Sequence, residues 1–598
     1  PLMPNGKINR KALPEIGGPG MSTGKTYVAP RTETEKKLVG IWEKILDRER
    51  IGVTDNFFEL GGHSLKTTRL RSQIQKEFGV TLLLKELFTK VVLEEQAEWI
   101  QQAKTTAYHA ITPVSVEPHY ALSSSQKRIW VLSQFEDGSA AYNMPGAYLF
   151  EGDLKLEALN FALKIVQQRH ESLRTLFKEN EQGEIRQFIL SPDELKFELV
   201  QTDLRNEKKQ DETLKQLVKD EFLKPFDLSA GPLQRAALFQ LTDKKWLFTY
   251  TLHHIISDGW SMGVLIRELL QLYNSFVRGE AHQLPELHIH YKDYAVWQQQ
   301  KLSGESLQQH KAYWLTQFEG ELPVLDFPGD HIRPAVQTYN GGIVSKQINK
   351  ARTKEIKEFC QQQGCTLFMG LLSAVNALLF RYTGQEDIIV GSPIAGREHT
   401  DLENQIGCYI NTLALRTKFK AHDSFKNVID HVKQVTLGAY DHQAFPFDEL
   451  VGALNLKRDT SRSALFDVMV TLQNNDQVKE GGLFQLQDLD VSVYQEIEDM
   501  SSKFDLSFDF VENNTEIRLS IEYNSDIYNE STITRLMDHL LKLIQMLVNY
   551  PDEPISKLEL LSEEEIQQQL TVFNKAILDY PKNKTIVDLF EEQVMLTP

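Results

Sequence analysis

The stretch that decides the fold is WLFTYTLHHIISDG, residues 246–259. Large apolar side chains occupy every second position of its first half and predict a strand with one apolar face. Asp258 and Gly259 then predict a turn, and the helical pattern of residues 263–273 follows. Strand-like and helix-like segments mix in this way over residues 120–560. We therefore expect an α/β architecture in one very large domain or two similar ones.

Two adjacent histidines, His253 and His254, end the predicted strand. His254 shares parity with four large apolar residues, so burial should remove water from its ring and keep it neutral. A neutral imidazole can accept a proton or a hydrogen bond, which makes His254 a candidate catalytic residue. A histidine that only packs in the core is the alternative. Adjacent strand residues point to opposite faces, which argues against a metal site made of His253, His254 and Asp258.

A second candidate site lies in DNFFELGGHSL, residues 55–65. The two aromatic residues would anchor a loop, and the two glycines allow the backbone to turn sharply. Ser64 then begins a predicted helix. Taken alone, Ser64 is interpreted as a helix N-cap. A nucleophile elbow of the GxSxG type is excluded, because residue 66 is Lys.

The residues around Ser64 predict a small all-α bundle. Thr32 and Glu35 have the spacing of a capping box, which begins a helix. Three apolar stripes with helical spacing follow, and Gly79 ends the second of them. The stripes are Leu38, Ile41, Trp42, Ile45 and Leu46; Leu70, Ile74 and Phe78; and Leu93, Ala97 and Ile100. Three or four short helices over this length fit a bundle.

Composition excludes several classes of protein. The chain has 598 residues, enough for about four domains, and its 65 basic and 83 acidic residues give a net charge of −18. That acidic excess argues against a nucleic-acid binder. Three cysteines without a CxxC pair predict no disulfide framework and no zinc site, and they favour a reducing, cytoplasmic compartment. We expect no membrane span, because no apolar run approaches about 18 residues. The N-terminus has neither an initiator Met nor a signal peptide, which predicts a piece of a longer chain.

Residues 27–102 resemble the peptidyl carrier proteins, whose attachment site is written DxFFxxGGxSL. Every fixed position of that pattern is matched within residues 55–65. The resemblance implies that Ser64 receives a 4′-phosphopantetheine group from a separate phosphopantetheinyl transferase. The position is physically reasonable, because unpaired N–H groups and the positive dipole end at a helix N-terminus stabilise a phosphodiester anion.

The following residues resemble the condensation domains of non-ribosomal peptide synthetases, whose signature HHxxxDG is matched at residues 253–259. Companion motifs occur in the family's order at residues 122–130, 169–177, 291–297, 406–412, 442–448 and 458–462. The chain departs from the family pattern at Ser125, Ala444, Ser463 and Ala464. The resemblance implies two lobes with the fold of chloramphenicol acetyltransferase, and peptide-bond formation between carrier-bound aminoacyl or peptidyl thioesters.

The resemblance also implies roles for individual residues. His254 would orient the attacking amine and handle its proton, and the N–H of Gly259 would assist the oxyanion. A strong base is not required, because an α-amine with a pKa near about 8 is partly neutral at neutral pH. The supporting residues would be His253, which packs; Asp258 and Arg174, which pair behind the site; and Asn411, which lines the active-site tunnel.

The expected domain order is an adenylation-domain tail with Lys7 and a linker (1–26), a four-helix carrier domain (27–102), a linker (103–118), the N-terminal lobe (119–285), the C-terminal lobe (286–560) and a connector to the next adenylation domain (561–598). Within the first segment, a P-loop is excluded because its first glycine would be Pro19. The partners implied are adjacent adenylation domains and a downstream carrier. A carrier that leads straight into the condensation domain implies an L-configured donor. A docking module that recruits a partner enzyme, and epimerisation on the same fold, are the alternatives.

Overall fold

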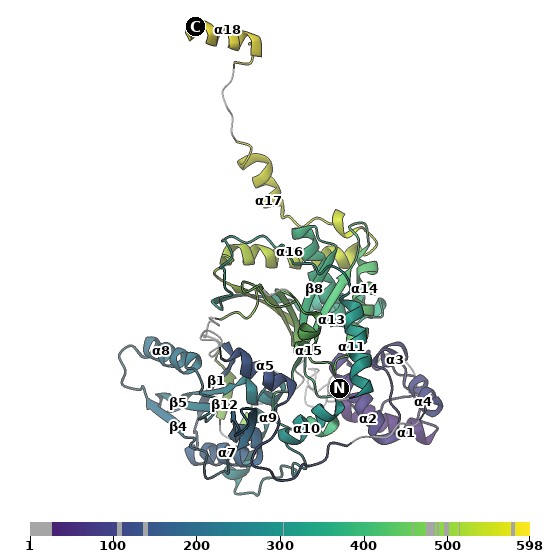
Figure 1. Cartoon of the computed structure of the whole chain (residues 1–598), viewed down its shortest axis with the longest axis vertical. Helices are drawn as coiled ribbons and strands as arrows, with labels where there is room; N and C mark the ends of the chain where they lie inside the picture. The colour runs from purple at the N-terminus through teal and green to yellow at the C-terminus, as the bar shows by residue number, and fades with distance from the viewer. Residues whose placement is uncertain are drawn as a thin grey trace, which may run out of the picture.

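The computed structural model describes residues 27–104, 110–134, 141–302, 304–456, 459–473, 485–486, 489–494, 501–513, 515–575 and 581–597. The predicted adenylation-domain tail at residues 1–26 and the first residue of the motif at 458–462 lie outside this part of the chain. Figure 1 shows a small helical unit beside a larger body of two lobes, and a C-terminal extension that leads away from both.

The small unit is the predicted carrier bundle. Its helices are α1 (Glu33–Leu46), α2 (Ser64–Phe78), α3 (Leu84–Thr89) and α4 (Leu93–Gln102). The capping box forms as predicted, with the Thr32 side chain accepting from the N–H of Glu35. Gly79 ends α2 in the left-handed region, with φ 63°. The three predicted stripes supply half of the core, in which Trp42, Leu70 and Ile74 are fully buried.

The N-terminal lobe is built on a six-stranded sheet in the order β11-β12-β1-β6-β5-β4. Helices α7 and α9 contribute to the main core of this lobe, whereas α8 packs on the sheet over a smaller core. The strands are β1 (Asn143–Gly152), β4 (Leu199–Asp203), β5 (Gln234–Thr242), β6 (Lys245–His253), β11 (Gln485–Leu486), β12 (Leu489–Val493) and the separate hairpin β2 (Thr175–Glu179) and β3 (Ile185–Ile189). The helices are α5 (Ser124–Leu132), α7 (Leu156–Arg169), α8 (Gln210–Leu223), α9 (Gly259–Arg278) and α10 (Tyr291–Lys301).

The C-terminal lobe holds a second six-stranded sheet, in the order β7-β14-β13-β10-β8-β9, around the largest hydrophobic core. Its strands are β7 (Gly341–Ile348), β8 (Asp387–Ile394), β9 (Asn411–Lys418), β10 (Val468–Gln473), β13 (Leu506–Asn513) and β14 (Glu516–Asn524). Its helices are α11 (Glu305–Gln317), α12 (Lys350–Gln362), α13 (Leu367–Thr383), α14 (Phe425–Asp441), α15 (Phe447–Leu454) and α16 (Glu530–Asn549). The two sheets confirm the predicted two-lobed α/β architecture.

Two strands from the C-terminal part of the chain join the N-terminal sheet and connect the lobes. β11 and β12 come from the part of the chain assigned to the C-terminal lobe, yet β12 pairs antiparallel with β1 of the N-terminal sheet, with Tyr148 opposite Val493. The sequence pattern gave no sign of this pairing. Because the chain of the C-terminal lobe supplies two strands of the N-terminal sheet, the pairing limits how far the lobes can separate.

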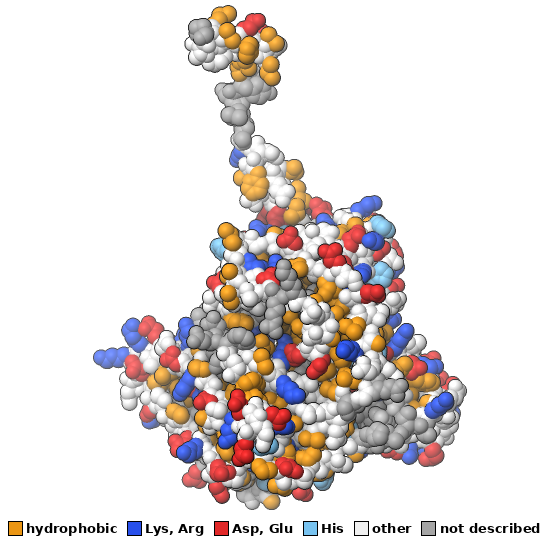
Figure 2. All heavy atoms as spheres, in the orientation of Figure 1, with side chains coloured by type: hydrophobic (Ala, Val, Ile, Leu, Met, Phe, Trp, Pro, Cys, Tyr) orange, Lys and Arg blue, Asp and Glu red, His pale blue; other side chains and the backbone are white. Residues whose placement is uncertain are grey.

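The described residues of the C-terminal extension form no core of their own. The extension consists of α17 (Glu563–Gln567), one π-helical turn (Gln568–Val572) and α18 (Ile586–Leu596), none of which contains a buried residue. Hydrophobic side chains of α18, among them Ile586 and Phe590, lie exposed at the end of the extension (Figure 2). Within the described ranges no single helix is long and apolar enough to span a bilayer; α12 and α13 together reach that length only across a bend of 101°.

Candidate functional site

The loop before Ser64 is held by aromatic packing. Phe57 is buried against Trp42, with ring centroids 5.0 Å apart, and Phe58 stacks on Phe88 at 5.2 Å. A Cβ atom on Gly62 would lie 2.2 Å from the Phe57 ring, so only glycine fits at this position. The neighbouring Gly61 adopts φ 100°, which also favours glycine. The loop therefore delivers the chain to the start of α2 in one fixed conformation.

Ser64 is the first residue of α2, and the N-cap is His63. The interpretation of Ser64 as a plain N-cap is therefore wrong by one residue. The first turn of α2 has no side-chain cap hydrogen bond and no acidic residue, which favours an anion at this helix end. Ser64 itself is half-buried, and its side chain lies next to that of Tyr440, at the end of α14 in the C-terminal lobe. The serine thus faces the larger body of the protein.

The carrier bundle contacts the C-terminal half of the chain through a hydrogen bond, apolar packing and ion pairs. Leu84 N–H donates to the carboxylate of Asp441 at 2.8 Å, and Tyr440 packs against the carrier core. Phe88 of the carrier packs in return against the core of the C-terminal lobe. Three basic side chains of α2 meet three acidic side chains: Arg69 binds Glu403 through two hydrogen bonds of 3.0 and 2.8 Å, Lys76 lies 3.4 Å from Asp401, and Arg71 lies 4.0 Å from Glu398.

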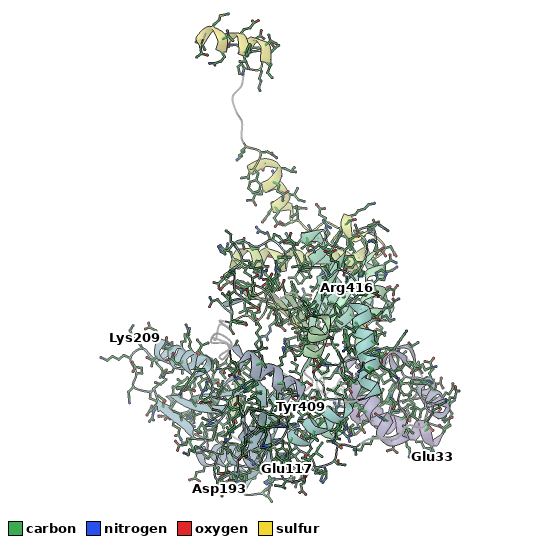
Figure 3. All side chains as sticks on the ribbon, viewed as in Figure 1. Glu33, Glu117, Asp193, Lys209, Tyr409 and Arg416 are labelled. Carbon is green, nitrogen blue, oxygen red and sulfur yellow. The ribbon has the colours of Figure 1, made fainter. Side chains whose placement is uncertain are left out.

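A cavity of about 890 Å³ lies between the two lobes, and His254 is part of its wall. Its lining comes from α5, α10 and α15, from the segment 393–412, and from the C-terminal sheet. Figure 3 labels Tyr409, one of the lining residues, where the lobes meet. Glu398 belongs to the same lining, so one end of the cavity reaches the acidic surface that contacts α2.

His254 does not lie on the strand as predicted. β6 ends at His253, and His254 begins a 3₁₀ turn (His254–Ile256), so strand parity does not set the direction of its side chain. The backbone N–H of His254 donates to the carbonyl of Tyr142 at 2.8 Å, and its Nδ1 lies 3.9 Å from the Cys408 sulfur. The turn, rather than the apolar face of the strand, brings the ring to the cavity.

The His254 ring is neutral, as predicted. Burial lowers its pKa to about 4, and the positive charge of Lys503 lowers it further in the same direction. Backbone groups of His254 and Ser257 favour the charged form and offset this lowering only in part. In a neutral imidazole one ring nitrogen carries the proton and the other is an acceptor. The arrangement can therefore accept an N–H from a substrate amine.

His253 is fully buried and packs away from the cavity lining. Its ring contacts Phe226 edge-on at 6.0 Å and Tyr142 at 6.5 Å, and its Nδ1 accepts from the N–H of Ile255 at 3.2 Å. Burial lowers the pKa of His253 to about 3, so it too is neutral. These contacts agree with a packing role beside the turn that carries His254.

The expected pairing of Asp258 with Arg174 is wrong. Arg174 donates to the backbone carbonyls of Gln167 and Leu190. The buried partner of Asp258 is Arg397, in the loop after β8, at 3.1 Å. Arg174 directly precedes β2 and stabilises the backbone around it through these hydrogen bonds. Arg397 belongs to the C-terminal lobe, and its side chain reaches Asp258 in the N-terminal lobe.

Asp258 is the centre of a buried hydrogen-bond network. One carboxylate oxygen accepts from the N–H of Ser261 at 2.8 Å and lies 2.7 Å from its hydroxyl; the other accepts from the N–H of Tyr409 at 3.0 Å. Arg397 also lies over the Tyr409 ring, 4.1 Å from its centroid, and donates to the Gln405 carbonyl at 2.8 Å. The network fixes the turn behind His254 to the opposite lobe.

We predict that Asp258 is coupled to Arg397 and not to Arg174. Removing one partner of a buried pair leaves an uncompensated charge, so Arg397→Met should lower the free energy of unfolding by about 3–5 kcal/mol. A double-mutant cycle of Asp258→Asn with Arg397→Met should give a coupling energy above about 1 kcal/mol. The matched cycle with Arg174→Met should give a value near zero. Coupling to Arg174 instead of Arg397 would contradict the assignment.

Gly259 and Asn411 have different relations to the cavity. Gly259 is the first residue of α9 and is exposed, and it is not among the residues that line the cavity. Its expected oxyanion role therefore stays a prediction without a supporting contact. Asn411 does line the cavity, and its amide donates to the carbonyls of Gln443 and Phe445, both at 2.9 Å. Asn411 thus also braces the loop before α15.

The departures from the family pattern gather at the cavity. Ser125, Ala444, Ser463 and Ala464 all line it, and Ser125 donates to the Ile410 carbonyl at 2.7 Å. Sequence reasoning missed Arg397, Ser261 and Tyr142 as parts of the site. The only available signal for Arg397 was an arginine just after a buried strand, a pattern too common to be specific.

Comparison with known proteins places these features in context. The condensation domain family matches residues 116–570, and the phosphopantetheine attachment site family matches residues 36–100. The chain is 42% identical over its whole length to tyrocidine synthase 3 of Brevibacillus parabrevis and covers 9% of that protein. It is 40% identical to gramicidin S synthase 2 of Brevibacillus brevis, again over its whole length, and covers 13% of it. The chain therefore spans less than a fifth of these relatives.

Solved structures share the fold of the two lobes. The X-domain from teicoplanin biosynthesis aligns in full with 76% of this chain, at 25% identity and a TM-score of 0.67. The first condensation domain of the calcium-dependent antibiotic synthetase aligns in full with 75% of this chain, at 20% identity and a TM-score of 0.61. The second likeness is one of fold alone.

Proposed function

The chain belongs to the condensation domain family, with a phosphopantetheine attachment domain in front of it, and on that premise we propose that it forms peptide bonds in non-ribosomal peptide synthesis. The donor would be held on Ser64, and the acceptor amine would come from a downstream carrier. One observation carries the proposal: the carrier lies against the larger body with the Ser64 side chain next to that of Tyr440, and His254 lines the cavity between the lobes of that body.

The residues around Ser64 fit 4′-phosphopantetheine. The hydroxyl begins a helix whose first turn has no side-chain cap and no acidic residue, which suits a phosphodiester anion. When bound, this group supplies a terminal thiol that holds the donor as a thioester. Ser64 provides the covalent bond, and the loop anchored by Phe57 and Phe58 fixes where the group starts.

His254 performs the chemistry that this chain contributes to the attack. Its neutral ring accepts an N–H of the acceptor amine and orients the nitrogen lone pair toward the donor carbonyl. Because the amine is partly neutral at neutral pH, positioning matters more than proton abstraction by a strong base. Asp258, Arg397 and the backbone of Tyr409 hold the turn behind His254 in place. The cavity walls limit access of water to the reacting carbonyl.

The position of the carrier supports a donor role. Arg71 of α2 lies against Glu398, which lines the cavity, and Tyr440 lies three residues before Gln443, another lining residue. A group attached to Ser64 can therefore enter the cavity from this side. A carrier adjoining the condensation domain, with only residues 103–118 between them, also favours an L-configured donor over epimerisation.

We predict that the ion pairs of α2 set this docking. Arg69→Glu should place two carboxylates side by side and slow transfer from Ser64 by about tenfold. The double variant Arg69→Glu with Glu403→Arg should recover most of the rate, because the pair is restored with opposite polarity. Lys36→Glu, which removes an exposed cation on α1, is the matched control and should leave the rate unchanged. No rescue in the double variant would contradict docking through this pair.

The test of the function is a transfer assay. A phosphopantetheinyl transferase loads Ser64 with a donor from aminoacyl coenzyme A, and a separately loaded downstream carrier is added. Dipeptide should accumulate on the downstream carrier in a single turnover, faster with an L- than with a D-configured donor. Adjacent adenylation domains would supply both aminoacyl groups in the longer protein. Absence of dipeptide with both carriers loaded would support the docking-module alternative.

A further inference from the structure

Lys503 lies on a short segment between the two lobes, just before β13. The N–H of Ser502 donates to the carbonyl of Tyr339 at 2.9 Å, and the side chain of Gln337 donates to the carbonyl of Lys503 at 3.0 Å. These bonds fix the backbone on both sides of the lysine. Its side chain is half-buried and lines the same cavity as His254.

The ammonium of Lys503 is placed next to the turn that holds His254. Its nitrogen lies 5.2 Å from the centroid of the Tyr142 ring, within the range of a cation–π contact. The carbonyl of Tyr142 accepts the backbone N–H of His254. Lys503 therefore reaches across from the C-terminal lobe to the residue that binds the histidine of the N-terminal lobe. Its charge contributes to the lowered pKa of both His253 and His254.

A neutral His254 brings no positive charge to the reaction. A carbonyl oxygen that gains negative charge during attack would still require a compensating charge or donor.

We propose that Lys503 is a catalytic residue, whose ammonium stabilises the negative charge that develops on the donor carbonyl oxygen. The inference rests on the proposed function. The amine nitrogen forms a bond to the carbonyl carbon, the carbon–sulfur bond breaks, and the proton lost by the amine is balanced by the proton gained by the sulfur. Lys503 keeps its proton throughout and acts through its charge.

The experiment compares Lys503→Gln, Lys503→Met and Lys503→Arg in the single-turnover transfer assay. The two neutral variants should lose about 10²–10³-fold in rate, the range typical for removing one oxyanion donor, and Lys503→Arg should retain most of it. Lys350→Gln, an exposed lysine on α12 of the same lobe, is the control and should match the wild type. An active wild type separates this test from failure of the proposed function itself.

A second readout does not depend on loading the protein. Histidine-selective NMR of the unloaded chain should show a higher pKa for His254 in Lys503→Gln than in the wild type, because a nearby cation has been removed. Rates within about threefold of the wild type in both folded neutral variants would overturn the proposal, since removal of one oxyanion donor costs far more. An equal loss in all three Lys503 variants with an unchanged His254 pKa would also overturn it.

Discussion

The Ser64→Ala variant should gain no mass from coenzyme A and should form no dipeptide. Ser64 is the hydroxyl that the anchored loop presents at the start of α2, so its removal leaves no oxygen for the phosphodiester bond. Intact-mass measurement after treatment with a phosphopantetheinyl transferase and coenzyme A checks this directly.

Thr68→Ala is the matched control for Ser64→Ala. Thr68 is one turn further along α2, and its hydroxyl donates to the Ser64 carbonyl at 3.2 Å. The control should gain the full mass of one phosphopantetheine group. An undiminished mass gain in Ser64→Ala, or its loss in the control, would show that the attachment site has been assigned to the wrong residue.

The His254→Ala variant should slow dipeptide formation by about 10²–10⁴-fold, the usual contribution of a positioned acid–base residue. A value near the lower end indicates that His254 mainly orients the amine. Loading of Ser64 should be unchanged, because the attachment site belongs to the carrier bundle. Dipeptide formation at the wild-type rate by a folded His254→Ala variant would remove the catalytic role.

His253→Ala is the paired variant for this experiment. His253 is buried against Phe226 and Tyr142, so its loss should lower the melting temperature more than the rate.

The pH profile of dipeptide formation tests whether His254 has to change its protonation state. Because the pKa of His254 is lowered to about 4, its protonation should not limit the rate near neutral pH. The rate should rise with pH from about 6 to about 8, as the acceptor amine loses its proton.

Local features of the structure were predictable from the sequence because they depend on neighbouring residues. The capping box at Thr32 and Glu35, the end of α2 at Gly79 and the loop before Ser64 each follow from side chains a few positions apart. The neutrality of His254 was predicted from an apolar strand face on which the residue does not lie, and it holds because the ring is buried at the turn instead. The direction of its ring was not predictable, because the strand ends one residue before it.

The long-range features had no local signal. The pairing of β12 with β1 joins residues that are far apart in the sequence, such as Tyr148 and Val493, and an isolated short strand does not indicate its partner. The same holds for Arg397, which reaches Asp258 from a loop in the other lobe. The family resemblance predicted Arg174 as the partner of Asp258, whereas the structure has Arg397 there. Which arginine lies close enough to Asp258 depends on how the two lobes pack, and the sequence does not show this.

The central claim is that the acyl group on Ser64 is transferred to an amine, and the masses of both carriers after a single turnover test it most directly. The account predicts that this chain returns to the mass of its unacylated phosphopantetheine form while the downstream carrier gains the mass of the donor residue. Loss of the acyl group from Ser64 with no gain on the downstream carrier would mean hydrolysis, and would contradict the account.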